Sequence, residues 1–377
     1  MIQFFVVFLR LMRLHIFNPE HDIALAANSE RFTPPHAGRQ LRSDLGWIPA
    51  LWAEDGDAVV VDDVQAAQRA IGKLRVHKPD VRFVTLSSAN EWRNDVTDVA
   101  VWGWDLLVCH ELRQAGVRDA LLPTKEQLAI WRDKSSRRWS AESLLPHLVA
   151  ADKRFVGESR WFDASKQSDL IEFLQENAQD STVCFVLKSP WSSSGRGVRY
   201  VSTLTPQQIG WIRNVMTAQG GLIVEPFYRK VVDFAMEFDA TPDGIAYRGL
   251  SVFKTDKSAY VGNLLATESE KRVLLEKYVP NDLLDLAKDK IIEQLNGSLA
   301  DYVGPLGVDM MIVVQDDGLR LHPCVELNLR STMGHVALSI SPTDVSPWRT
   351  MRIVYTDRYH LQILNTWENV LPMSIVR

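Results

Sequence analysis

Four polar residues in the last quarter of the chain carry the clearest chemical signal. Asp309 lies in one apolar run, and Glu326, Asn328 and Arg330 occupy alternate positions of a second run. Alternation along a β-strand puts these last three side chains on one face. An Asp-Gly pair between the two runs is typical of a hairpin turn, which brings Asp309 to the same neighbourhood.

This combination of side chains suits a metal ion and an acidic substrate. Carboxylate and amide oxygens are hard ligands that fit Mg²⁺ shared with a polyphosphate. Asp309, Glu326 and Asn328 are therefore candidate metal ligands. Arg330 beside them suits a carboxylate or a phosphoryl group in transfer. Taken alone, the same alternation also fits a solvated polar face on an edge hairpin.

A loop rich in serine and glycine forms the second cluster. A β-prone run ends in Lys188, and the loop after it contains Ser193, Ser194, Gly195 and Gly197 before another β-prone run. Small residues let backbone N–H groups approach a phosphate closely, and the lysine adds a positive charge at the base of the loop. The residue order differs from a Walker A motif. An ordinary hairpin with a serine tip is the alternative interpretation.

The elements that position these clusters begin with alternating strands and helices. Strands are predicted at 14–17, 59–61, 81–86 and 99–101, and helices at 64–74 and 105–114. This alternation is typical of a parallel sheet with helices on its faces. No GxGxxG motif follows any of these strands, so a dinucleotide-binding fingerprint is absent from the sequence.

The rest of the chain predicts a different arrangement of longer elements. One helix is expected from Thr124, a plausible N-cap, to Trp139. The later elements follow from apolar periodicity. They are a strand–loop–strand unit at 183–201, a helix from 206, strands at 222–224, 231–238 and 245–255, a helix at 281–302, and strands at 307–314 and 319–328.

Composition places limits on location and partners. The 377 residues are 46% hydrophobic and carry a formal net charge of −5, so a basic surface for nucleic acid is not expected. The apolar run at 4–9 is too short for a membrane span, and we expect residues 1–11 to be an upstream start extension before Met12. Three scattered cysteines indicate a reducing compartment, so we expect a cytoplasmic protein.

These motifs, in this order, resemble the ATP-grasp superfamily over residues 124–340. The resemblance implies an α/β fold with a parallel-sheet pre-ATP-grasp domain at 1–123. A first ATP-grasp lobe with the glycine loop would follow at 124–224, and a second lobe with the metal site at 225–377. Residues 341–377 receive no functional assignment.

The resemblance also implies which residues hold ATP. Lys134 and Lys188 look like the two family lysines that contact the phosphates, and the glycine loop matches the family's flexible loop. Glu225 and Phe227 look like the hinge that holds adenine, and Asp233 looks like the ribose acid. The intervening Pro226 departs from the pattern, because it removes a backbone donor from the hinge.

The metal and substrate sites follow in the same way. Asp309, Glu326 and Asn328 match the family's Mg²⁺ ligands, with Mn²⁺ as a second candidate ion, although the two acids are farther apart than in the D-alanine ligases. The run Glu326-Leu327-Asn328-Leu329-Arg330 is similar to that of carboxylase-type members, in which the arginine binds the acid that is activated.

Three further residues are candidates for the substrate site. His21 follows the first strand, where open α/β sheets bind ligands. Arg248 and Lys254 lie on the strand between the hinge and the acidic hairpin. A satisfied histidine and ordinary surface charges are the alternatives for these three.

The implied activity is an ATP-dependent ligation. A small carboxylate would be activated as an acyl phosphate, with Lys188 and Arg330 as catalytic residues, and an amine or another nucleophile would then attack it. A kinase of the same fold and a non-catalytic ATP-binding regulator are the alternatives. The expected partners are small molecules rather than nucleic acid or membrane. A homodimer stays open, because many members of the superfamily are dimers.

Overall fold

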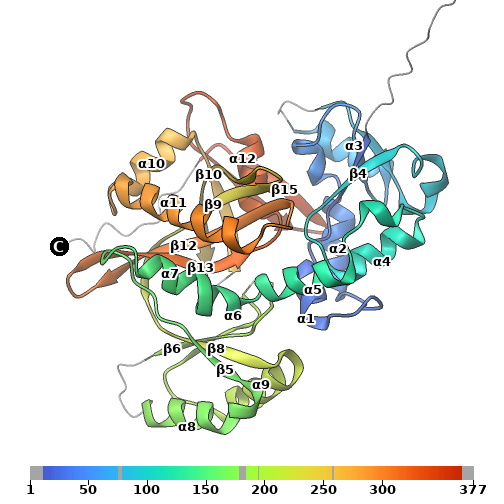
Figure 1. Cartoon of the computed structure of the whole chain (residues 1–377). Helices are drawn as coiled ribbons and strands as arrows, with labels where there is room; N and C mark the ends of the chain where they lie inside the picture. The colour runs from blue at the N-terminus through green and yellow to red at the C-terminus, as the bar shows by residue number, and fades with distance from the viewer. Residues whose placement is uncertain (1–11, 75–78, 178–183, 194, 257–258, 367–377) are drawn as a thin grey trace, which may run out of the picture.

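The computed structural model describes residues 12–74, 79–177, 184–193, 195–256 and 259–366. Within them the chain forms three β-sheets with helices on their faces, which confirms the predicted α/β class. Figure 1 shows the three sheets as separate lobes, with the N-terminal sheet in blue and the small central-segment sheet in green and yellow. The expected start extension at 1–11 lies outside the described residues.

The N-terminal sheet is parallel, with the strand order β3-β2-β1-β4. Asp63 and Asp105 cap two of its helices by accepting hydrogen bonds from backbone N–H groups. Its strands are β1 (Met12–Ile16), β2 (Ala58–Val60), β3 (Arg82–Val84) and β4 (Val96–Val101). Its helices are α1 (His21–Ala27), α2 (His36–Leu45), α3 (Val64–Gly72) and α4 (Leu106–Gln114), with short turns η1 (Ile48–Leu51), η2 (Leu86–Glu91) and η3 (Asp119–Leu121).

A four-stranded antiparallel sheet, ordered β5-β8-β6-β7, carries the glycine loop between β6 and β7. Figure 1 shows α8 and α9 on its outer face. Its strands are β5 (Arg160–Asp163), β6 (Phe185–Lys188), β7 (Val198–Val201) and β8 (Gly221–Pro226). Its helices are α8 (Gln167–Asn177), which follows the turn η5 (Ala164–Lys166), and α9 (Pro206–Gln219).

The largest sheet has seven antiparallel strands in the order β13-β12-β9-β10-β11-β14-β15. Its strands are β9 (Arg229–Thr241), β10 (Gly244–Asp256), β11 (Ala259–Leu265), β12 (Gly304–Gln315), β13 (Gly318–Asn328), β14 (Arg349–Tyr355) and β15 (Tyr359–Leu364). Its helices are α10 (Glu268–Glu276), α11 (Asn281–Ser298) and α12 (Met333–Ile340). The domain boundaries placed after residues 123 and 224 stay predictions.

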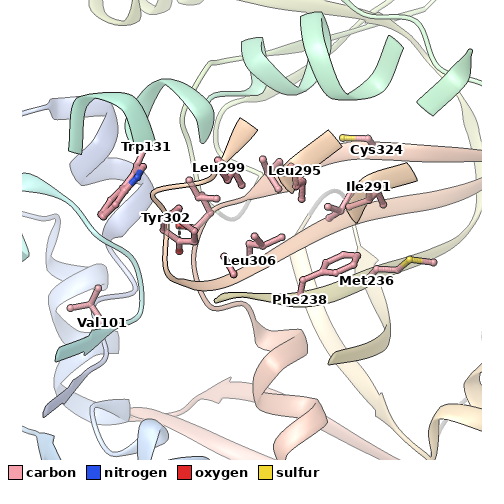
Figure 2. Close-up of a cluster of buried hydrophobic side chains, with 14 of the residues drawn as sticks. Val101, Trp131, Met236, Phe238, Ile291, Leu295, Leu299, Tyr302, Leu306 and Cys324 are labelled. Carbon is pink, nitrogen blue, oxygen red and sulfur yellow. Dashed lines mark hydrogen bonds between the residues drawn. The ribbon is translucent and has the colours of Figure 1, made fainter. Parts of the chain in front are cut away.

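The main core lies between α11 and one face of the large sheet. Met236 and Phe238 of β9 are fully buried there with Ile291 and Leu295 of α11 (Figure 2). Because side chains alternate along a strand, this burial turns Asp233, Ala235 and Glu237 to the opposite face. The hydrophobic face of β9 therefore fixes the orientation of its acidic face.

The predicted helix from Thr124 to Trp139 is wrong in one respect, because the structure divides it. Helix α5 (Lys125–Lys134) ends at Ser135, and the short α6 (Arg137–Trp139) begins after Ser136, whose hydroxyl accepts a hydrogen bond from the N–H of Trp139. A π-helical turn, η4 (Ser140–Leu144), and α7 (Leu145–Val149) continue the chain. A serine hydroxyl competes with the helical backbone, which explains the interruption.

The C-terminal hairpin β14–β15 joins the large sheet to the N-terminal sheet. Met351 and Leu361 share one hydrophobic cluster with Phe17, Leu45 and Trp102 of the N-terminal segment. The N–H of Tyr359 donates to the Asp44 carboxylate at 2.9 Å. The hairpin, which received no assignment from sequence, therefore holds two sheets together.

None of the helices in the part of the chain that the structure describes is long and apolar enough to cross a membrane.

The main core makes a direct prediction for stability. Replacing the fully buried Leu295 with alanine removes methyl groups from the contact between α11 and the large sheet. We expect a loss of about 2–5 kcal/mol in the free energy of unfolding, measured by denaturant titration. Val303→Ala is the control, because Val303 is 54% exposed and should change stability by less than about 0.5 kcal/mol. Equal effects of the two changes would contradict the assignment of this core.

Candidate active site

The acidic hairpin forms one row of side chains on the large sheet. In the strand register, Asp309 lies opposite Glu326, and Gly307 lies opposite Asn328. Burial and the neighbouring Glu326 carboxylate raise the pKa of Asp309 to about 7, while Arg330 and Asn328 act in the opposite direction. The structure therefore brings the three predicted metal ligands together, with two carboxylates facing each other across the strand pair.

Arg137, which sequence analysis did not identify, lies in this cluster. Its Nη2 is 2.9 Å and 2.8 Å from the two carboxylate oxygens of Glu326. Its Nη1 donates to the Ser189 carbonyl at 2.9 Å and to the Ser192 hydroxyl at 2.7 Å. The break between α5 and α6 aims this buried guanidinium at the site. The two serines Ser135-Ser136 were the available signal, since serine commonly starts a helix.

Lys134, the lysine predicted at this point, is directed elsewhere. Its Nζ lies 5.1 Å from the centre of the Trp139 ring. No ion pair joins it to a carboxylate within the described ranges of the chain, whereas Arg137 is paired with Glu326. Arg137 rather than Lys134 therefore supplies positive charge between the glycine loop and the acidic row, and phosphate binding by Lys134 stays a prediction.

The glycine loop is closely packed at its base. The N–H of Ser189 donates to the carbonyl of Gly197 at 2.9 Å. A side chain at Gly197 would collide with the hydroxyl groups of Ser189 and Ser192, so only glycine fits there. Gly195 has a φ of 69°, and the carbonyl of Ser193 accepts a hydrogen bond from Arg196. Ser194, predicted to bind phosphate, lies outside the described residues.

The side chain of Lys188 contacts both the small sheet and the large sheet. Its Nζ is 2.6 Å from a carboxylate oxygen of Glu225 and donates to the Val325 carbonyl of β13 at 3.4 Å. Both Lys188 and Glu225 are buried. Phe227 is half exposed, and its N–H, predicted to face adenine, donates to the Cys184 carbonyl at 2.8 Å. The structure thus brings the predicted lysine and hinge acid together.

The remaining predicted residues lie at different distances from this cluster. Asp233 lies on the same face of β9 as the acidic row and bonds Lys230 and the Thr255 hydroxyl. Arg248 has a mostly exposed side chain that pairs with Asp239 at 3.1 Å. Alternation along β10 turns Lys254 to the face opposite Phe253, which lies beside Asp233. Asp233 therefore shares the face of the acidic row, whereas Lys254 lies on the opposite face.

Helix α1 of the N-terminal segment reaches the site through Asp22 in its first turn. Its carboxylate oxygens each accept a hydrogen bond of 2.9 Å from Arg330, which also donates to Asn328 at 2.8 Å. Burial opposes the charge of Asp22, but the adjacent Arg330 guanidinium lowers the pKa of that carboxyl. His21, the predicted residue, is buried and bonds Asp105 at 3.0 Å. The neighbour of His21, rather than His21 itself, therefore contacts the site.

Glu237 is a second residue that sequence analysis missed. It flanks Gly307 on the side away from Asn328, on the face of the acidic row. One carboxyl oxygen accepts from the Thr332 hydroxyl at 2.9 Å, and the other lies 3.1 Å from Nδ1 of His335. A side chain at Gly334 would overlap the Glu237 carboxyl, so the first turn of α12 packs directly on it.

The hydrogen bonds of His335 indicate the state of Glu237. Nε2 of His335 lies 3.2 Å from the Phe238 carbonyl and so carries the ring proton, while Nδ1 accepts from the Thr332 N–H. The Glu237 oxygen beside Nδ1 forms a favourable contact only if it carries a proton. Consistently, burial and then the Asp309 carboxylate raise the pKa of Glu237 to about 8. Burial and the Asp309 charge therefore favour the neutral acid form of Glu237.

Comparisons with known proteins place this fold beside solved structures. No protein-family model matches the chain. No curated protein matches its sequence. N5-carboxyaminoimidazole synthetase from Staphylococcus aureus, solved with ADP, has 10% identity and a TM-score of 0.48, over 91% of this chain and 82% of that one.

Two further neighbours have similar values. A putative ATP-grasp superfamily protein from Archaeoglobus fulgidus has 13% identity and a TM-score of 0.44, over 94% of this chain and 100% of that one. The D-cycloserine synthetase DcsG has 10% identity and a TM-score of 0.45, over 87% of this chain and 97% of that one. Likenesses this distant carry no information about a substrate.

Replacing Glu237 with glutamine tests the buried acid. The folded-state pKa of about 8 exceeds the ordinary value of 4.5, so the folded protein keeps a proton that the unfolded chain releases between these values. Wild-type stability from this group therefore falls as pH rises through that window. Glutamine does not titrate, and its amide can bond both Thr332 and His335. We compare the free energy of unfolding of Glu237→Gln with that of the wild type at each pH. This difference should increase by about 2–4 kcal/mol in favour of the variant between about pH 5 and pH 8.

Denaturant titrations at the two pH values provide this measurement. Glu237→Ala is the comparison, because it removes both hydrogen bonds and should destabilise the protein at either pH. A difference between Glu237→Gln and wild type that does not change with pH would show that Glu237 is ionised in the folded protein.

Proposed function

We propose that this protein is an ATP-dependent ligase that activates a small carboxylate as an acyl phosphate for attack by an amine or another nucleophile. The observation that carries the proposal is the convergence of two clusters from separate sheets. Arg137 and Lys188 join the glycine loop of the small sheet to the acidic hairpin of the large sheet. A site with a phosphate-type loop on one side and acidic metal ligands on the other suits Mg-ATP.

The small sheet supplies most of the groups for the nucleotide, and β9 of the large sheet supplies one. In this proposal Lys188 and backbone N–H groups of the glycine loop bind phosphate oxygens. Glu225 can accept hydrogen bonds from the adenine amino group, and Asp233 can accept them from ribose hydroxyls. The Phe227 N–H is already bonded to Cys184, so we assign adenine recognition at the hinge mainly to Glu225.

The acidic row fits a divalent cation. Asp309, Glu326 and Asn328 offer three oxygen ligands, and a bound cation would stabilise the charged form of Asp309, whose pKa is raised by burial and then by Glu326. Mg²⁺, or Mn²⁺ in its place, would supply neutralisation of the charge on the ATP phosphates. The other contributions to the reaction come from the side chains and backbone of the chain itself.

The proposed reaction is a phosphoryl transfer followed by an acyl transfer. An oxygen of the substrate carboxylate attacks the γ-phosphorus in line, and the bond to the β-γ bridging oxygen breaks to release ADP. The nucleophile then attacks the carbonyl carbon of the acyl phosphate and displaces inorganic phosphate. Arg137, Lys188 and the loop N–H groups act by positioning and by stabilising charge, which dominate catalysis of phosphoryl transfer.

Arg330 is the proposed site for the substrate carboxylate. Its planar guanidinium already holds one carboxylate in a two-pronged arrangement, that of Asp22. A substrate acid would exchange with Asp22 or share the guanidinium with it. Glu237 and Thr332 hold the start of α12, two residues beyond Arg330, and so keep this arginine in place.

Release of ADP from ATP is the first test of this function. We expect Mg²⁺-dependent release that increases when pooled small carboxylic acids and amino acids are added. Glu326→Gln should abolish it, because it removes a charged ligand from the acidic row. Glu172→Gln, at an exposed position of α8, is the control and should leave it unchanged.

The products distinguish the alternatives to a ligase. A stable phosphorylated product would indicate a kinase instead. Tight Mg-ATP binding without acceleration by any pool would favour a regulator that binds ATP without catalysis.

Arg330→Lys tests the carboxylate site separately. Lysine keeps the positive charge but loses the planar pair of donors. We expect kcat to fall by about 10²–10³-fold because the acid is misplaced. The ATP dissociation constant, measured by calorimetry, should change much less. Equal damage to ATP binding and turnover would contradict the assigned role.

A further inference from the structure

Arg137 is bonded at once to both halves of the candidate active site. Its Nη1 and Nη2 donate to Ser189 and Ser192 at the base of the glycine loop, and its backbone N–H donates to the Pro190 carbonyl at 3.0 Å. The same Nη2 contacts both oxygens of Glu326. The Arg137 side chain is only 7% exposed, so the guanidinium has no substantial contact with solvent to replace these partners.

The contact with Glu326 conflicts with the role of Glu326 as a metal ligand. Both carboxylate oxygens face a guanidinium nitrogen, and a cation bound to them would lie beside that positive charge. Among the described ion pairs, Glu326 is the only carboxylate paired with Arg137. The ion pair between Arg137 and Glu326 therefore competes with two other contacts. It weakens binding of a divalent cation by Glu326, and it weakens binding of a phosphate by Arg137.

A similar pairing lies at the start of the glycine loop. Lys188, the last residue of β6, is bonded to Glu225, 2.6 Å away. Two cations that face the proposed phosphate position are thus each neutralised by a carboxylate of the chain. A triphosphate brings several negative charges and can replace both carboxylates as the partner of these cations.

We propose that Arg137 is a latch that exchanges Glu326 for the nucleotide phosphates, so that metal and nucleotide binding depend on each other through this residue. This inference rests on the proposed function, because it assumes that Mg-ATP occupies the cleft. Without nucleotide, the latch closes the glycine loop onto β13 and withholds Glu326 from a metal ion. With nucleotide, Arg137 turns to the phosphates and the Glu326 carboxylate is released to the cation.

The latch has a thermodynamic consequence that can be measured without turnover. If one ligand frees the group that the other ligand needs, each raises the affinity of the protein for the other by the same factor. Couplings of this kind are typically about 5–150-fold. We therefore expect ADP to raise the affinity for Mn²⁺ by a larger factor in the wild-type protein than in a variant that lacks the Arg137 side chain.

Mn²⁺ titrations followed by electron paramagnetic resonance, with and without ADP, provide the experiment. In Arg137→Lys we expect Mn²⁺ alone to bind about 5–10-fold more tightly than in wild type, and the coupling to ADP to fall by a similar factor. Lysine is the decisive substitution, because it keeps the charge but cannot bond Ser189, Ser192 and Glu326 together. Arg138→Gln is the control, since Arg138 is half exposed and pairs with Glu142 outside the cleft.

Each outcome separates the latch from the proposed function. Wild-type affinity for Mn²⁺ in Arg137→Lys, with unchanged coupling to ADP, would overturn the latch and leave the ligase proposal standing. Failure of the wild-type protein to bind ADP with Mn²⁺ would overturn the proposed function itself. If Arg137→Lys unfolds, Arg137→Gln gives the same comparison, and undiminished coupling in that variant would again overturn the latch.

Discussion

Asp309 and Glu326 face each other across an antiparallel strand pair, and much of the surrounding structure offsets their charge. Arg137 pairs with Glu326, and Arg330 lies close enough to stabilise the charge of Asp309. Glu237, one strand further along the sheet, keeps its proton because burial and Asp309 both oppose its ionisation. Like charges at this spacing are costly in a buried setting, so the cluster requires the positive charge that Arg137 and Arg330 place beside it.

The same constraint explains why three sheets meet here. The large sheet supplies the acids, the loop of the small sheet reaches Arg137 through Ser189 and Ser192, and the N-terminal segment contributes Asp22 opposite Arg330. Each contact joins segments that are distant in sequence, such as Asp22 and Arg330. The polar residues of the site therefore also connect the three sheets to one another.

Sequence patterns predicted the parts of the site that depend on local geometry. The alternation of Glu326 and Asn328 and the Asp-Gly turn of the hairpin were sufficient to group the acids, because strand period and turn chemistry are local. Arg137 was missed because the apolar pattern continues through the break between α5 and α6, and only tertiary contacts show where the side chain points. Glu237 looked like one polar position in a buried strand, since its partners Thr332 and His335 lie far along the chain.

The order of these segments along the chain affects how the protein is made. Met351 and Leu361 belong to the same hydrophobic cluster as Phe17, Leu45 and Trp102, although they follow these residues by a long stretch of chain. Until the later residues are made, this cluster lacks part of its packing. Because exposed apolar surface favours aggregation, protection of the nascent chain by a chaperone would benefit a protein of this design.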